Sequence, residues 1–132
     1  MGTIPVGSKR EERLLVTREV AIDFMGLETA RVLSTPHLVG FLEMTARNLA
    51  KELVGPESDS VGSHINVFHL AATPVGMQVR VVAEVVGVDG RRVDFKLEAY
   101  DEREKIAEGT HQRVIVDVAR FASRVQAKAA GQ

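Results

Sequence analysis

His69 is the clearest candidate for chemistry in this sequence. It interrupts an apolar run in HINVFHLAATPVG, residues 64–76, and small residues follow it. Strand alternation places it on one face with Val67 and Ala71. A histidine titrates near neutral pH and can act as a general base. Two interpretations stay open at this point: a core histidine with a satisfied hydrogen bond, and a catalytic base with cleared space beside it.

Glu43 is the second candidate. At roughly 100° per residue, its neighbours on one side of a helix are Val39, Ala46 and Ala50. Most helix glutamates are solvated surface residues, but these small or apolar neighbours suggest a second surface that faces a partner. A carboxylate on such a surface could act as a nucleophile or as a base.

Thr35, Gly62 and Arg113 could complete a binding site. Thr35 precedes Pro36, which predicts Thr35 as the cap of a helix, and the N–H groups at a helix N-terminus can also stabilise an oxyanion. Gly62 is either a turn residue or a point where a ligand approaches the backbone closely. Arg113 shares a predicted strand face with His111, and it is either a solvated charge or a contact for an anionic group.

The composition excludes several other functions. The chain has 132 residues, no cysteine and a net charge of −1, from 17 basic and 18 acidic residues. This balance gives no excess of positive charge that would attract nucleic acid or an anionic membrane. The lack of cysteine rules out a thiolate nucleophile and a cysteine zinc site. The other histidines, His37, His64 and His111, form no HxH or HExxH pair, so we expect no metal site and no cofactor.

The N-terminal residues MGTIPVGSKREERLLV lack the apolar segment of a signal peptide. No window approaches the roughly 18 consecutive apolar residues that a membrane span needs. We therefore expect a single domain over residues 1–132, cytoplasmic and without a membrane partner.

The strongest element that could position these residues is a helix over residues 34–53. Apolar or small side chains recur there at helical spacing and form one stripe: Leu38, Phe41, Leu42, Thr45, Ala46, Leu49 and Leu53. Val54-Gly55-Pro56 then stops the helix.

Strands are predicted on both sides of this helix. Asp89-Gly90 predicts a tight hairpin, because both residues tolerate a positive φ. The other predicted elements, in chain order, are a loose surface segment (1–10), a strand (11–20), a turn and loop (21–33), the helix, a loop (55–63), four strands (62–72, 77–88, 91–101 and 105–117) and a short helical tail (119–132).

These elements predict an α+β fold with one long helix on an antiparallel sheet. Apolar and polar residues alternate in VDFKLEAYD, residues 93–101, so one face of the sheet is wet. One helix cannot cover the other face completely. We therefore expect pairing with a second copy as a homodimer, with a tetramer as a further option.

Three segments resemble the fluoroacetyl-CoA thioesterase family and its wider hot-dog thioesterase relatives. They are HLAATPVGMQVRVVAEV, VDGRRVDFKLEAYDE and IAEGTHQRVIV, within which HLAATPVG, VDGRR and GTHQR are the most specific pieces. The STPHLVGFLE block resembles the start of the family's central helix and keeps its spacing between a threonine and a glutamate. The resemblance runs from about Val16 to Phe121 and implies the hot-dog fold, an antiparallel sheet wrapped around one long central helix.

The resemblance also implies a site and an activity. In the family, a threonine and a glutamate of the central helix and a histidine of the following strand form the catalytic set, which corresponds here to Thr35, Glu43 and His69. Gly62 corresponds to the glycine that lines the thioester site, and Arg113 to the arginine on the last strand. The family hydrolyses acyl-CoA thioesters as dimers with active sites at the subunit interface. Coenzyme A would then be part of the substrate and not a cofactor.

The segment before Thr35 departs from the family. The fluoroacetyl-specific enzyme has a phenylalanine-bearing lid there, whereas residues 26–34, GLETARVLS, contain no aromatic residue and Phe24 lies farther back. We therefore expect a general acyl-CoA thioesterase without selectivity for a fluorinated acyl group. Two alternatives stay open: a dimer that binds an acyl-CoA without catalysis, and a hot-dog dehydratase or hydratase.

Overall fold

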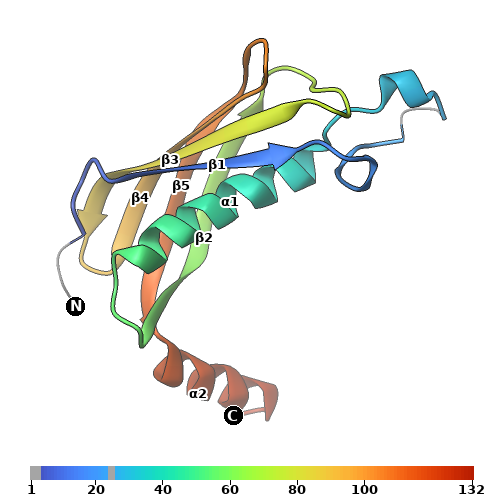
Figure 1. Ribbon diagram of the computed structural model, residues 1–132. Helices are drawn as coiled ribbons and strands as arrows, with labels where there is room; N and C mark the ends of the chain where they lie inside the picture. The colour runs from blue at the N-terminus through green and yellow to red at the C-terminus, as the bar shows by residue number, and fades with distance from the viewer. Residues whose placement is uncertain (1–3, 24–25) are drawn as a thin grey trace.

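The computed structural model describes residues 4–23 and 26–132 and shows a five-stranded antiparallel sheet packed against one helix (Figure 1). Helix α1 (Thr35–Glu52) crosses one face of the sheet, and α2 (Val118–Ala129) follows the last strand. The strands, in the spatial order β1-β3-β4-β5-β2, are β1 (Lys9–Leu15), β2 (Ser58–His69), β3 (Gln78–Asp89), β4 (Arg92–Tyr100) and β5 (Lys105–Asp117). The predicted α+β fold is confirmed.

The core lies between α1 and the sheet. Helix α1 buries Leu38 and Leu42, and β4 buries Phe95 and Leu97 from the opposite side. These strand residues alternate with polar ones, as VDFKLEAYD predicted, because successive side chains of a strand point to opposite faces. The core therefore fixes which side of α1 faces the sheet.

One prediction about α1 is wrong because of this core. Ala46 and Ala50 were expected to share a partner-facing surface with Glu43, but both alanines are at most 1% exposed and belong to the core. Glu43 and Val39 lie at the border, and both are half-buried. The surface around Glu43 is thus narrower than predicted.

The N-cap of α1 also differs from the prediction. Ser34 caps the helix, since its Oγ accepts a hydrogen bond from the backbone N–H of His37. Thr35 is the first helical residue and Pro36 the second. The first N–H groups of a helix have no acceptor within it, so the missing N–H of Pro36 costs no helix hydrogen bond. The hydroxyl of Thr35 is therefore available for another partner.

β2 begins earlier and ends earlier than predicted. Residues 58–61 lie in the predicted loop 55–63, yet they pair with β5, with Ser58 opposite Asp117. Ser58, Asp59 and Ser60 have little strand propensity of their own, so pairing with the long β5 decides their conformation. The strand ends at His69, which places the candidate base at its last residue.

Part of the segment 1–10, which was predicted to be loose, contacts the rest of the fold: the Gly7 N–H donates to the Val85 carbonyl, whereas Val6 is 64% exposed. Ile4 is 3% exposed, and β1 starts at Lys9, before the predicted strand 11–20. Residues Arg18–Val20 form a 3-10 turn and not the end of that strand.

The β3–β4 hairpin forms, with its turn displaced by one residue. Asp89 pairs with Arg92, so the loop residues are Gly90 and Arg91, and Gly90 has a φ of 61°. The strand predicted over 105–117 has the observed bounds of β5.

Candidate active site

Thr35 and His69 meet where α1 begins and β2 ends. Thr35 Oγ1 lies 2.8 Å from His69 Nδ1. The contact is possible because Ser34 provides the helix cap and leaves the neighbouring hydroxyl free. Two of the residues predicted from the sequence therefore form a hydrogen-bonded pair within one chain.

The two ring nitrogens of His69 have different surroundings. Nε2 is buried and has no hydrogen-bond partner among the described residues, whereas Nδ1 faces Thr35. Burial lowers the pKa of His69 below its ordinary value, and the nearby backbone of Ala71 partly offsets this shift. The imidazole is therefore neutral at neutral pH, which is the state that a general base requires.

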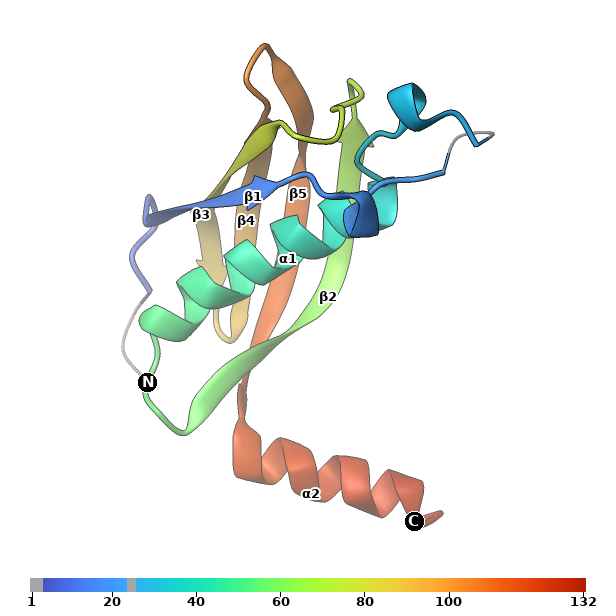
Figure 2. The same ribbon diagram turned by 45° about the vertical axis from the view of Figure 1, so that its right-hand side comes forward.

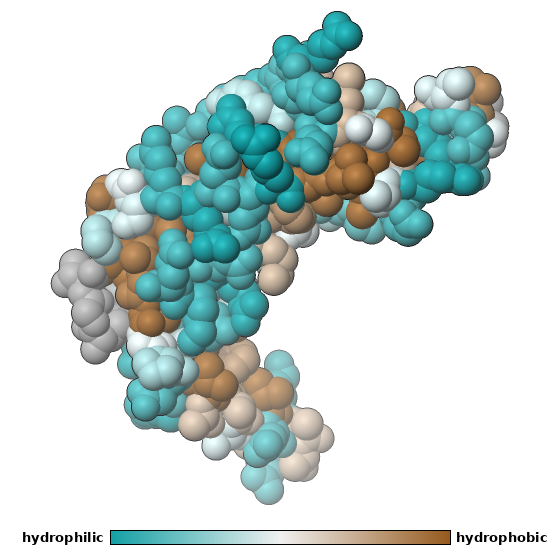
Figure 3. Space-filling model, viewed as in Figure 1, coloured by the Kyte–Doolittle hydropathy of each residue, from teal (hydrophilic) through white to brown (hydrophobic). Residues whose placement is uncertain are grey.

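A hollow of about 440 Å³, here called the acyl hollow, opens beside this pair. Most of its wall is apolar, from Ile22, Val32, Leu33, Leu70, Ala71 and Ala72. The two alanines leave the space beside the imidazole that the sequence predicted. Apolar surface is visible at the end of the molecule where α1 begins (Figure 3). Phe24, the aromatic residue that precedes segment 26–34, lies outside the described residues.

Glu43, Gly62 and Arg113 meet in a second cluster. Arg113 Nη1 lies 3.8 Å from Glu43 Oε2, and a Cβ at Gly62 would lie 3.4 Å from the same oxygen. Along α1, Glu43 lies about 12 Å from Thr35, at about 1.5 Å per residue. Within one chain, the structure thus gathers the five predicted site residues into two groups: Thr35 with His69, and the cluster around Glu43.

Arg113 is 4% exposed and is not the solvated charge that was its default interpretation. Its Nε donates a hydrogen bond to Ser60 Oγ at 2.7 Å, and its Nη2 donates to the Ser60 carbonyl at 3.0 Å. Burial lowers the pKa of the guanidinium, and the charge of Glu43 opposes that shift. These bonds hold the charge of Arg113 beside Glu43.

The sequence assigned no role to His111, which supports Arg113. The ring is 1% exposed; its Nδ1 donates to the His64 carbonyl at 2.7 Å, so its Nε2 accepts from Arg113 Nη1 at 3.1 Å. Burial is the main cause that lowers the pKa of His111, and the charge of Arg113 lowers it further. The only signal in the sequence was the shared strand face of His111 and Arg113.

A smaller hollow of about 240 Å³ lies beside Gly62 and is lined by Glu43, His64 and His111 among others. A Cβ at Gly62 would lie 3.3 Å from the ring of His111. Glycine therefore keeps this hollow open next to the carboxylate.

Within residues 4–23 and 26–132, no three or more side chains of the metal-binding types are grouped to hold an ion. Neither helix in the described ranges has the length and apolar character to cross a membrane.

Comparison with known proteins identifies the family. Residues 16–119 match the profile of the family described as fluoroacetyl-CoA-specific thioesterase. The fluoroacetyl-CoA thioesterase of Streptantibioticus cattleyicolor is 35% identical over 101 residues, which cover 76% of this chain and 73% of that protein.

Solved structures share the whole fold. A structure of the fluoroacetyl-CoA thioesterase FlK has a TM-score of 0.84 at 28% identity and covers 96% of this chain and 98% of that chain. A thioesterase superfamily member from Thermus thermophilus has a TM-score of 0.86 at 27% identity over 100% of both chains. A variant of the fluoroacetyl-CoA-specific enzyme in complex with fluoroacetate and CoA has a TM-score of 0.80 at 29% identity, over 89% of this chain and 99% of that chain. The chain therefore belongs to the fluoroacetyl-CoA-specific thioesterase family, which confirms the predicted hot-dog fold and the predicted class of thioester hydrolase.

Proposed function

We propose that this chain hydrolyses an acyl-CoA thioester to a carboxylic acid and coenzyme A, with Thr35 and His69 of one subunit and Glu43 of a second subunit at each site. The observation that carries the proposal is the 2.8 Å contact between Thr35 Oγ1 and His69 Nδ1 at the wall of the acyl hollow. A neutral base and a hydroxyl group beside an apolar pocket suit the hydrolysis of a thioester.

In the proposed mechanism, His69 accepts a proton from the attacking water through Nδ1, directly or by way of the Thr35 hydroxyl. The water oxygen bonds to the thioester carbonyl carbon, and N–H groups at the start of α1 stabilise the resulting oxyanion together with Thr35. The C–S bond then breaks, and the imidazolium returns the proton to the CoA thiolate. Glu43 either orients the water or attacks the carbonyl to give a transient anhydride that water opens.

The two edges of the sheet support a homodimer that forms through β2. β1 has the sequence KREERLL, whose charges discourage the addition of another strand. β2 is 12 residues long and carries a single carboxylate, Asp59, with no lysine or arginine. A long edge strand of low charge can pair with a copy of itself.

Symmetric pairing of β2 would also complete the site. If two copies of the strand run antiparallel about an axis between Ile65 and Asn66, Gly62 of one chain lies opposite the partner's His69. Glu43, which lies beside Gly62, then approaches the partner's Thr35 and His69. This arrangement supports an active site built from both chains.

The acyl hollow favours an apolar acyl group. Among the described residues that line it, none is a lysine, an arginine or a carboxylate, so a charged acyl group would be buried without a partner. Residues 26–34 contribute Val32 and Leu33 to the wall and contain no aromatic side chain. We propose a general preference for alkyl acyl groups over fluoroacetyl.

The test is release of free thiol from short, branched, aromatic and long acyl-CoAs by the pure protein. We expect turnover of several alkyl thioesters. His69→Asn should lower kcat by about a hundredfold to ten-thousandfold, with an unchanged mass and thermal midpoint. Thr35→Ser, which keeps a hydroxyl, should retain more activity than Thr35→Val.

The two alternatives have distinct outcomes. Calorimetric binding of acyl-CoA without thiol release from any substrate would identify a non-catalytic binder. Formation or hydration of an enoyl-CoA without thiol release would identify a dehydratase or hydratase. Full turnover by His69→Asn would remove His69 from the proposed mechanism.

A further inference from the structure

A hollow of about 560 Å³, here called the α2 hollow, lies where α2 meets the end of β5. Arginines from two parts of the chain line it: Arg91 from the β3–β4 turn, and Arg120 and Arg124 from α2. Arg120 and Arg124 are one helical turn apart and so share a side of α2. Figure 2 shows α2 projecting away from α1 and the sheet. None of these residues belongs to the site described above.

These arginines lack carboxylate partners. Most basic side chains of the described residues lie within 4.0 Å of a carboxylate. Those outside these ion pairs are Lys51, Arg91, Arg103, Arg120, Arg124 and Lys128. Three of these side chains line the α2 hollow. Guanidinium groups without carboxylate partners that converge on one hollow are suited to bind phosphate.

The rest of the lining fits a nucleotide. Val114 and Val116, which share a face of β5, provide an apolar wall, against which a base can lie while its phosphates reach the arginines. Asp117 is the one carboxylate in the lining, and its Oδ1 is occupied as the cap of α2, where it accepts from the Arg120 N–H at 3.0 Å.

The substrate of the proposed reaction needs such a site. Coenzyme A carries a diphosphate and a 3′-phosphate, whereas the described lining of the acyl hollow holds no lysine or arginine. Arg113 is buried and bonded to Ser60. With a net charge of −1, the chain as a whole does not attract anions. The cations for the phosphates must therefore be local.

We infer that the α2 hollow binds the adenosine 3′-phosphate 5′-diphosphate end of coenzyme A, an inference that rests on the proposed thioesterase function. Along β5, Asp117 at the rim lies about 13 Å from Arg113 in the Glu43 cluster, at about 3.3 Å per residue. The pantetheine arm separates the sulfur of CoA from its diphosphate by a comparable length. The family match ends at residue 119, so Arg120 and Arg124 lie beyond it.

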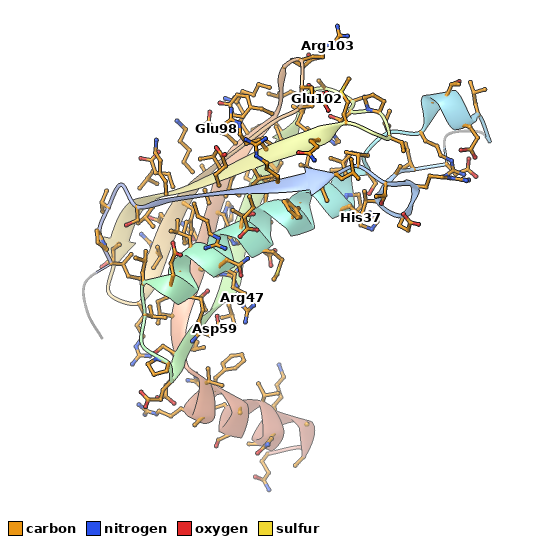
Figure 4. All side chains as sticks on the ribbon, in the orientation of Figure 1. His37, Arg47, Asp59, Glu98, Glu102 and Arg103 are labelled. Atoms are coloured by element: carbon orange, nitrogen blue, oxygen red, sulfur yellow. The ribbon has the colours of Figure 1, made fainter. Side chains whose placement is uncertain are left out.

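The test compares two thioesters of one acyl group: the acyl-CoA, and the acyl-N-acetylcysteamine, which keeps the thioester and lacks the phosphates. The double variant Arg120→Ala/Arg124→Ala should raise KM for the acyl-CoA by about 10-fold to 100-fold with little change in kcat. It should leave kcat/KM for the truncated thioester at the wild-type value. The control is Arg103→Ala, another arginine outside the ion pairs, which lies at the end of the sheet far from α2 (Figure 4); it should leave both substrates unaffected.

An unchanged KM for the acyl-CoA in the double variant would overturn the inference. An equal loss on both substrates would also overturn it, because a phosphate site cannot affect a substrate without phosphates. If the wild type releases thiol from neither thioester, the proposed function fails, and calorimetric titration with CoA and with ADP then tests the hollow by itself. At least tenfold weaker CoA binding by the double variant supports the inference. No CoA binding by the wild type, or ADP bound as tightly as CoA, overturns it.

Discussion

At the residue scale, the surroundings of His69 predict the pH dependence of the reaction. The base must be deprotonated to accept a proton, and burial lowers the pKa of His69. The deprotonated form therefore persists to lower pH than in an ordinary histidine. A plot of kcat/KM against pH should rise to a plateau with a midpoint below about 6.5. A midpoint above that value would indicate that another group is the base.

Gly62 allows a second prediction at the same scale. An added methyl group would lie 3.3 Å from His111 Cε1 and 3.4 Å from Glu43 Oε2, so it would displace Glu43 or fill the hollow beside it. Gly62→Ala should lower kcat by about tenfold to a hundredfold, because small misplacements of catalytic groups are costly. Gly55→Ala, with nothing within 4 Å of the added Cβ, is the matched control. Equal activity of both variants would contradict a role for the space at Gly62.

The sequence predicted the residues that carry the chemistry better than the buried residues that hold them in place. Thr35 and His69 carry side chains whose chemistry is visible in the sequence, and they are in contact. Ser60 was overlooked because it lies in a polar stretch predicted to be a loop, and nothing in the local sequence shows that it bonds to Arg113 on the neighbouring strand. Buried polar residues that hold a site residue of another strand depend on the strand register, which one sequence does not specify.

At the element scale, the contact between β2 and β5 sets the position of His69. Gly109 of β5 lies opposite Val67, and a Cβ there would be 2.0 Å from the Asn66 carbonyl oxygen. Gly109→Ala must therefore push the two strands apart. We expect a loss of about 3 kcal/mol or more in the free energy of unfolding, at the upper end of the usual cost of overpacking.

Urea unfolding of the single variants Gly109→Ala and Gly87→Ala, measured in parallel, gives this loss in the free energy of unfolding. The added Cβ of Gly87→Ala would meet the end of the flexible Asp94 side chain at 3.3 Å, so that variant should lose less than about 1 kcal/mol. Similar midpoints for both variants would show that β2 and β5 can separate without cost.

The boundaries of the elements show what local sequence can and cannot predict. The helix 34–53 was clear because its apolar stripe and its stop signal agree. Its N-cap was predicted as Thr35 but is Ser34. The two hydroxyl residues are adjacent, and proline suits either of the first two helical positions. The start of β2 was missed because its conformation depends on pairing with β5.

At the scale of the whole molecule, the two groups of site residues require an explanation. Arg47 of α1 and Asp59 of β2 form an ion pair beside the Glu43 cluster (Figure 4), so α1 and β2 are fixed to each other there. The separation of about 12 Å between Thr35 and Glu43 along α1 is set by the helix itself. If Glu43 acts on the pair of Thr35 and His69, as proposed above, a second chain can bring it there without unfolding part of the first.

A composite site predicts that two inactive variants can restore each other. In a mixed dimer of His69→Ala and Glu43→Ala, one of the two sites combines an intact His69 with an intact Glu43 from the other chain, and the second site lacks both. If the chains exchange at random, half of the dimers are mixed and the mixture should recover about a quarter of the wild-type turnover. The experiment measures thiol release after the variants are unfolded together and refolded, once light scattering has shown a dimeric mass.

Two controls distinguish turnover by mixed dimers from activity that either variant recovers on refolding alone. Each variant refolded alone should stay inactive, and a chain that carries both substitutions, mixed with wild type, should give no gain beyond the wild-type sites that remain. If Glu43 and His69 acted within one chain, every site of a mixed dimer would lack one of them. Absence of recovery in a mixture shown to contain mixed dimers would therefore place the whole site in a single subunit, against the pairing of β2 strands proposed here.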